Sequence, residues 1–239
     1  METKSLNLLC LPYAGGSENI YLNWKKEIIS GVNVIPIELS GRGRRIQDPL
    51  YKNLDEAIED IYRKSYDHIF NSPFALFGHS MGSIMVYELA KKIIKETEKK
   101  PEFLVFSGKN PPHVGLGTNY HELPNDLMLQ KLQELGGIKP EFSNYPELLS
   151  LFLPIIRSDF KLVETYKHAP SIPFDSDIYV MHGSSDTITN RSSLKEWDNY
   201  TTSNCFYKEV EGDHFFIDTN SKVVINYINS VCTEYLVYC

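Results

Sequence analysis

The sequence predicts an α/β protein built on a mostly parallel sheet. Short apolar runs typical of buried strands alternate along the chain with stretches in which apolar residues recur at helical spacing. This alternation is typical of parallel sheets, whose two faces are covered by the connecting helices. The chain has 239 residues, of which 42% are hydrophobic and 23% charged, so it can bury one sizeable core. We therefore expect a single domain spanning residues 1–239.

The expected elements follow in a regular order over most of the chain. The apolar runs that we expect to form strands are residues 6–11, 32–39, 74–77, 103–108, 178–183 and 205–210. Helical spacing is found over residues 20–29, 54–70, 84–90 and 221–235. The alternation stops at about residues 110–171, an insertion with helical stretches at 126–135, 146–153 and 155–166.

The most informative stretch is GHSMG at residues 78–82, between an apolar strand and a helical pattern. A serine at the apex of such a turn has a strained backbone, and side chains at Gly78 and Gly82 would collide with the neighbouring elements. The helix directs its positive end toward Ser80, and the N–H of Met81 can hold an oxyanion. The stretch predicts a nucleophile elbow, although G-x-S-x-G also recurs by chance.

Two further residues follow later predicted strands. Asp186 comes shortly after the strand at 178–183, and His214 shortly after the strand at 205–210. The carboxyl ends of parallel strands share one edge, so we expect Ser80, Asp186 and His214 to meet there. A serine needs a base to become nucleophilic, and that base needs an acceptor that fixes its tautomer. The three residues therefore predict a catalytic triad.

The other histidines and a neighbouring carboxylate have more ordinary explanations. We expect His79 to pack beside the elbow and His182 to lie in the core. Asp213 is adjacent to His214, but adjacent residues on a turning segment rarely face each other, which favours Asp186 as the partner. Four histidines lie at helix ends or in the insertion and belong to no constellation: His68, His113, His121 and His168.

Two glycine-containing loops follow the first two strands. The loop YAGGS at 13–17 lets backbone approach a substrate closely, as the second oxyanion loop of a serine hydrolase does. It lacks the G-K-[ST] ending of a phosphate-binding loop and the G-x-G-x-x-G spacing of a dinucleotide site. The loop GRGRR at 41–45 carries Arg42, Arg44 and Arg45, whose forked donors suit phosphate. A solvated loop is the alternative explanation.

Composition limits the partners and the location. A net charge of −7 argues against a nucleic-acid-binding surface over the whole molecule. The first residues lack a secretory pattern and no apolar run reaches membrane-spanning length, so we expect a cytoplasmic protein without membrane contact. The cysteines are scattered, and neither a metal site nor a disulfide framework is expected. We expect Cys10 and Cys205 to be buried on strands and Cys239 to be an exposed thiol.

Motifs outside the predicted triad make the sequence more specific. They are LPYAGGS at 11–17, GRGRR at 41–45, GHSMG at 78–82, SG at 107–108 followed by PH at 112–113, LGG at 135–137, RSD at 157–159 with Tyr166, and GDHFF at 212–216. With these motifs the chain resembles the type II thioesterases of nonribosomal peptide and polyketide synthesis, from Leu8 to about Ile228. One departure is Ser40, where the family usually has proline, and we expect it to affect loop rigidity only.

The resemblance implies an α/β-hydrolase fold with a helical lid at about 110–171. It implies hydrolysis of acyl groups from the phosphopantetheine arm of a transiently bound acyl or peptidyl carrier protein, by a monomer without a cofactor of its own. Ser80 would attack the thioester, His214 would act as base and Asp186 would orient it. The N–H groups of Met81 and of Ala14, with Tyr13 as an alternative, would hold the oxyanion.

The apolar run at 148–156 is either a lid over the catalytic face or ordinary packing onto the sheet. Its candidates for shaping an acyl pocket are Leu148, Leu151, Phe152 and Ile155. Arg42, Arg44 and Arg45 are candidates for contacting the arm's phosphate or the carrier. Alternative functions are a small-molecule carboxylesterase or lipase, an acyltransferase, or a non-catalytic scaffold that kept the fold.

Overall fold

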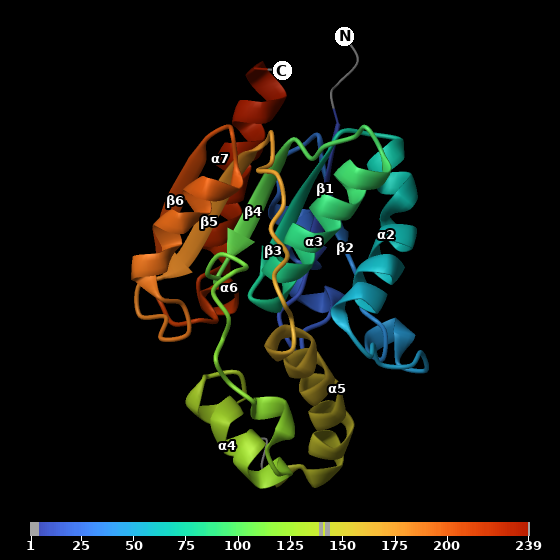
Figure 1. Ribbon diagram of the computed structural model, residues 1–239, viewed down its shortest axis with the longest axis vertical. Coiled ribbons are helices and arrows are strands. Elements are labelled where there is room, and N and C mark those ends of the chain that lie inside the picture. The colour runs from blue at the N-terminus through green and yellow to red at the C-terminus, as the bar shows by residue number, and fades with distance from the viewer. Residues whose placement is uncertain (1–4, 139–140, 142–143, 239) are drawn as a thin grey trace.

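The computed structural model describes residues 5–138, 141 and 144–238. Its centre is a sheet of parallel strands in the order β2-β1-β3-β4-β5-β6 (Figure 1). The strands are β1 (Leu6–Leu11), β2 (Val32–Pro36), β3 (Phe74–His79), β4 (Phe103–Ser107), β5 (Asp177–Gly183) and β6 (Cys205–Val210). The predicted α/β architecture with a parallel sheet is confirmed, and every predicted strand is present.

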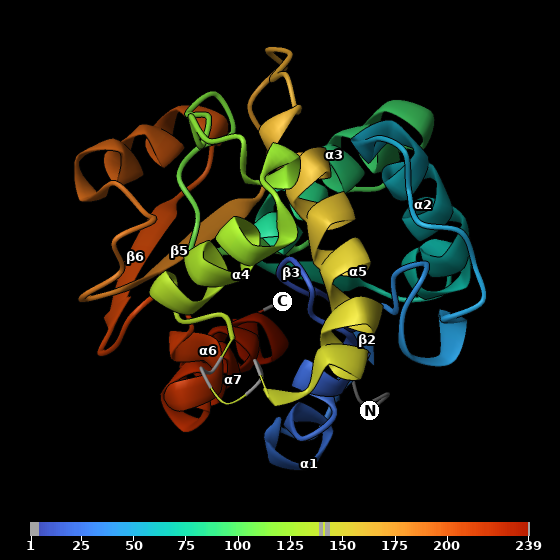
Figure 2. The ribbon, with the colours of Figure 1, turned by 90° about the horizontal axis from the view of Figure 1, so that it is seen from below.

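Helices cover both faces of this sheet. The α-helices are α1 (Trp24–Glu27), α2 (Leu54–Phe70), α3 (Met81–Glu96), α4 (Asn125–Glu134), α5 (Pro146–Glu164), α6 (Phe216–Thr219) and α7 (Ser221–Tyr238). Short 3-10 helices are formed by Glu18–Tyr21, Gly43–Arg45, Tyr120–Glu122 and Arg191–Tyr200. One apolar core lies between the sheet and α2 and α3, and a second lies between the sheet and α1, α6 and α7 (Figures 1 and 2).

Three predicted helical stretches differ from the observed helices. The stretch 20–29 forms only the short 3-10 helix Glu18–Tyr21 and the single turn α1, so the prediction of one continuous helix was wrong. The stretches 146–153 and 155–166 form one helix, α5, which continues through Pro154. A proline removes one backbone donor, and the burial of Leu153 and Ile156 on either side offsets that loss.

Helices α4 and α5 extend beyond the sheet, although Leu162 near the end of α5 belongs to the core that contains α2 and α3. They lie beyond the carboxyl ends of the strands, at the bottom of Figure 1 and toward the viewer in Figure 2. Between them is a small apolar cluster of Met128, Leu132, Leu153 and Ile156. The insertion therefore covers the edge of the sheet at which the predicted triad lies.

Two further predictions concern the burial of the cysteines and the absence of a membrane-spanning helix. Cys10 is buried on β1, whereas Cys205 is only half-buried on β6, because β6 is an edge strand of the sheet. Cys239 lies outside the described residues. None of the helices in the described part of the chain combines the length and the apolar character that crossing a membrane requires.

Candidate active site

Ser80 lies in a sharp turn between β3 and α3. Its φ of 54° makes it the one non-glycine residue with positive φ in the described parts of the chain. A Cβ atom at Gly78 would lie 2.2 Å from the carbonyl oxygen of Gly82, and one at Gly82 would lie 2.2 Å from that of Leu11. Real Cβ atoms do not come this close to backbone, so both positions require glycine. The geometry is that of the predicted nucleophile elbow.

The three residues predicted from separate strand ends form a hydrogen-bonded series with His214 in the middle. His214 Nε2 is 2.8 Å from Ser80 Oγ, and His214 Nδ1 is 2.9 Å from Asp186 Oδ2. His214 is only 4% exposed. With Nδ1 donating to the carboxylate, Nε2 is free to accept the serine proton. The arrangement is that of a serine nucleophile, a base and an orienting carboxylate.

Asp186 is fixed by donors from the loop that follows β5. Its Oδ1 accepts the amides of Ile188 and Thr189 at 2.8 and 3.1 Å, and its Oδ2 accepts the Thr189 hydroxyl at 2.7 Å. Burial raises the pKa of Asp186, but the hydrogen bonds from His214, Thr189 and Ile188 outweigh it and bring the pKa to about 2. The carboxylate is therefore ionised over the whole neutral range. Asp213 instead accepts the amide of Phe215 at 2.8 Å, as befits the residue that does not face His214.

His79 is fully buried beneath the triad. Its Nε2 is 2.8 Å from the carbonyl oxygen of His214, so Nε2 donates and the Ser107 hydroxyl, 2.8 Å from Nδ1, donates to the other nitrogen. Burial and the neighbouring His214 lower the pKa of His79 to about 3. His79 thus stays neutral and holds the backbone of the base, and the prediction that it packs beside the elbow is confirmed. His182 lies on β5, 8% exposed, as also predicted.

Backbone amides border the serine. Within the described residues, the N–H groups of Tyr13, Ala14 and Met81 donate to no acceptor of the protein. All three residues line the same cavity as Ser80. Gly15, which follows Ala14, has a φ of 79°, and a Cβ there would lie 2.7 Å from Ile156 Cγ1. The glycine therefore lets this loop turn directly beneath α5.

The cavity in front of Ser80 has a volume of about 410 Å³. Ser80 and His214 lie on one side, and apolar side chains of α4 and α5 line the other: Leu132, Leu149, Phe152, Leu153, Ile156 and Phe160. In the described residues, no group of three or more His, Cys, Asp or Glu side chains is placed to hold a metal ion. The cavity suits an apolar chain attached to a reacting carbonyl group.

Of the predicted pocket residues, only Phe152 lines this cavity. Leu148 and Leu151 are 37% and 48% exposed and are not among the residues that line it. Ile155 is buried at 4% exposure, but helical spacing places it on the face shared with Asp159 and Leu162, away from the cavity. Leu149, Leu153, Ile156 and Phe160 were missed, although their i, i+4, i+7, i+11 spacing marks one face of a helix.

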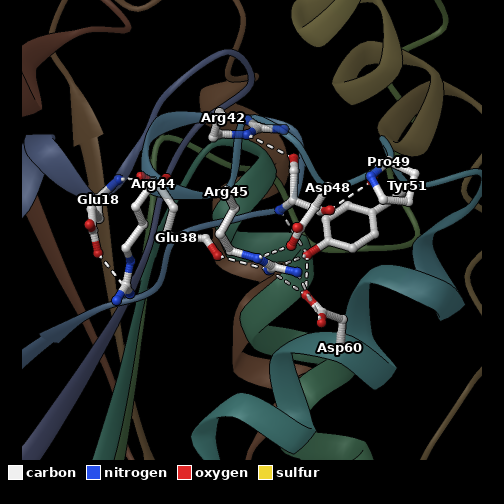
Figure 3. Close-up of polar contacts among 10 residues, drawn as sticks. Glu18, Glu38, Arg42, Arg44, Arg45, Asp48, Pro49, Tyr51 and Asp60 are labelled. Atoms are coloured by element: carbon white, nitrogen blue, oxygen red, sulfur yellow. Dashed lines mark hydrogen bonds and ion pairs between the residues drawn. The ribbon is translucent and has the colours of Figure 1, made fainter.

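The side chains of the arginine loop are paired with carboxylates of the protein, which the sequence did not predict (Figure 3). Arg42 is 3% exposed and forms an ion pair with Asp159, so its assignment to phosphate or carrier contact was wrong. Arg45 is held by Asp48 and Asp60 at 2.7 and 2.6 Å and is also largely enclosed. Only Arg44 presents its side chain to solvent, at 66% exposure, beside Glu18. The sequence did not indicate which arginine had a distant partner.

Comparison with known proteins identifies the family. The family model of the thioesterase domain matches residues 6–232. The chain belongs to the thioesterase family. Two relatives of this thioesterase cover nearly its whole length: linear gramicidin dehydrogenase LgrE of Brevibacillus parabrevis and gramicidin S biosynthesis protein GrsT of Aneurinibacillus migulanus. The first is 32% identical over 96% of this chain and 89% of its own, and the second 31% identical over 93% and 87%.

Solved structures agree with this assignment. The crystal structure of ClbQ from the colibactin NRPS/PKS pathway superposes on this thioesterase with a TM-score of 0.92, at 32% identity over 98% of both chains. The fold is the α/β-hydrolase fold with a mostly parallel central sheet, as predicted. The resemblance to type II thioesterases is confirmed, and with it the assignment of the protein as a thioester hydrolase.

Proposed function

We propose that this thioesterase removes acyl groups from the phosphopantetheine arm of carrier proteins in a nonribosomal peptide or polyketide assembly line. The observation that carries the proposal is the hydrogen-bonded series Ser80, His214 and Asp186 facing an apolar cavity enclosed by α4 and α5. The assignment to such an assembly line is supported by similar proteins that are named for gramicidin S biosynthesis and for the colibactin NRPS/PKS pathway. The carrier proteins are transient partners, and the enzyme acts as a monomer without a cofactor of its own.

The geometry supports a two-step acyl transfer to water. Ser80 Oγ attacks the thioester carbonyl carbon while its proton passes to His214 Nε2. The carbon–sulfur bond breaks, and His214 returns the proton to the departing thiolate, which leaves a free pantetheine thiol. Water then gives a proton to His214 and its oxygen attacks the acyl-serine; Ser80 leaves with that proton and the acid is released. Asp186 keeps His214 in the required tautomer throughout.

The oxyanion formed in each step needs donors that are already in place. We assign this role to the amide of Met81 at the N-terminus of α3 and to the amide of Ala14, with Tyr13 as its alternative. All three residues line the same cavity as Ser80. Loss of one such donor typically lowers kcat about 100-fold or more. The roles of these amides account for the glycine loop directly after Ala14.

We also propose that residues 110–171 act as a lid over the acyl chain. The apolar faces of α4 and α5 enclose the cavity on the side opposite Ser80. Arg44 is the arginine of its loop with an exposed side chain, and it is our candidate for a contact with the carrier or with the arm's phosphate. A net charge of −7 gives no overall attraction to an acidic carrier, so docking would need a local basic or apolar patch.

A dehydrogenase activity, as in the name of LgrE, is not favoured. The loop after β1 reads YAGGS and lacks the G-x-G-x-x-G spacing of a dinucleotide-binding turn. The elbow and the triad instead supply the nucleophile and base that hydrolysis needs.

The substrate class is tested by comparing three substrates that carry the same acyl group in different ester or thioester bonds. Octanoyl-loaded carrier protein, octanoyl-coenzyme A and p-nitrophenyl octanoate present a carrier thioester, a free thioester and an oxygen ester. We expect the highest kcat/KM with the loaded carrier. Equal or higher kcat/KM with the oxygen ester would favour a carboxylesterase and contradict the proposal.

A further inference from the structure

We infer that the buried ion pair between Arg42 and Asp159 is a positioning device for the oxyanion loop. The inference rests on the proposed function, because it assumes that the amide of Ala14 or Tyr13 holds the oxyanion. We call residues 13–16 the oxyanion loop. The pair joins this loop to the arginine loop and to helix α5, three segments that are far apart in the sequence.

The ion pair is bidentate, with two guanidinium nitrogens facing the two carboxylate oxygens. Arg42 Nη1 lies 2.6 Å from Asp159 Oδ2, and Nη2 lies 2.7 Å from Oδ1. The side chains of the two residues are 4% and 1% exposed. Burial lowers the pKa of Arg42, but the Asp159 charge and hydrogen bond outweigh it and raise it above its usual value. The two side chains are therefore enclosed, with their orientation fixed by two parallel hydrogen bonds.

Both members of the pair also hold the oxyanion loop itself. Asp159 Oδ2 accepts the amide of Gly15 at 2.7 Å. Arg42 Nη1 donates to the carbonyl oxygen of Gly16 at 3.1 Å. The two contacts fix the N–H of Gly15 and the C=O of Gly16, the residues that directly follow Ala14. The peptide plane that carries the proposed oxyanion donor is thus fixed from its C-terminal side.

The pair also connects the loop to the lid. Asp159 lies on α5, the helix whose Ile156 packs against Gly15 and lines the acyl cavity. A displacement of this part of α5 would therefore move the acceptor of the Gly15 amide. The structure couples the position of α5 to the geometry of the oxyanion donors.

A purely stabilising role would not require this arrangement. Replacing a buried ion pair by packed apolar residues is often neutral or stabilising for a protein. Here the charges also satisfy two backbone groups of a loop whose position matters to within about 1 Å for catalysis. Both residues belong to motifs noted in the sequence, GRGRR and RSD, to which the triad assigns no role.

The test compares Arg42→Gln and Asp159→Asn with wild type, using hydrolysis of an acyl thioester and inhibition by an acyl trifluoromethyl ketone. That ketone forms an oxyanion adduct with the serine and therefore reports the donors directly. We expect kcat to fall about 10- to 100-fold with KM within about threefold. The inhibition constant of the ketone should rise by a similar factor. A fall in kcat without a rise in that constant would overturn the inference, as would an unchanged kcat.

The matched control is Arg45→Gln in the same loop. Arg45 is also paired with carboxylates, Asp48 and Asp60, but it does not contact the oxyanion loop. We expect Arg45→Gln to lower the thermal midpoint without raising the inhibition constant of the ketone. A rise in that constant equal to the rise in Arg42→Gln would overturn the inference. Should a single variant fail to fold, the Arg42→Gln/Asp159→Asn double variant removes both charges together, and the same inhibition constant decides. Failure of the proposed function would be seen separately, as full activity of Ser80→Ala.

Discussion

The buried imidazole of His79 predicts a specific dependence of stability on pH. The ring is fully enclosed and the pKa of the folded state is about 3, because burial and the neighbouring His214 disfavour its charge. In the unfolded chain the pKa returns to the ordinary value of 6.5. As the pH falls, the unfolded state therefore binds a proton before the folded state does. The contribution of His79 to the free energy of unfolding is complete above pH 6.5 and is lost progressively toward pH 3.

The size of the effect follows from these two pKa values. Between pH 7 and pH 5 the unfolded chain takes up most of one proton at this site, and the folded protein takes up almost none. The free energy of unfolding should fall by about 2 kcal/mol from His79 alone. A folded pKa anywhere below about 4 gives the same result, so this number does not depend on the depth of the shift.

The measurement is urea unfolding of wild type and of His79→Gln at pH 7 and pH 5. Glutamine can retain the donor to the His214 carbonyl but does not titrate. Contributions of the other histidines are present in both proteins and cancel in the comparison. We expect the loss of stability between the two pH values to be smaller in the variant by about 2 kcal/mol. An equal loss in both proteins would refute the assignment of His79 as a buried neutral residue.

Three further predictions concern the elbow, the acid and the cavity. Gly82→Ala places a Cβ against fixed backbone and should lower the free energy of unfolding by about 3 kcal/mol or more, while Gly115→Ala, with open space around it, should cost less than about 1 kcal/mol in urea unfolding. Asp186→Asn should lower kcat about 10⁴-fold with little change in KM, because the His214 tautomer is no longer fixed; a loss below tenfold in steady-state kinetics would contradict its role. Leu149→Phe should lower kcat/KM for long acyl chains about tenfold relative to short ones, whereas Leu148→Phe, on the exposed side of α5, should leave the chain-length profile unchanged.

The sequence predicted the catalytic edge well because that edge depends on local patterns. Each strand ends in a recognisable turn, and parallel strands bring those ends together without further information. Ser80, Asp186 and His214 could therefore be assigned from their positions after three strands. The strained φ of Ser80 and the close approach of Gly78 and Gly82 are the physical reason for the motif.

The arginine loop and the insertion at 110–171 were predicted less well because their contacts are distant in the sequence. Arg42 looks like an exposed anion-binding residue until Asp159, more than a hundred positions later, is placed beside it. The apolar run of α5 similarly contains two faces. Leu149 and Leu151 differ by two positions, which puts them on different sides of one helix. Which side faces the cavity depends on how the insertion packs over the sheet.

The proposed release of acyl groups from a carrier protein depends on Ser80 as the nucleophile. It is tested most directly by following release from one acyl-loaded carrier protein by wild type and by Ser80→Ala, with intact-protein mass spectrometry of the carrier as the readout. We predict that the variant releases the acyl group at least about 10⁴-fold more slowly, while the folded fraction is unchanged. Release by Ser80→Ala at the wild-type rate would contradict the claim.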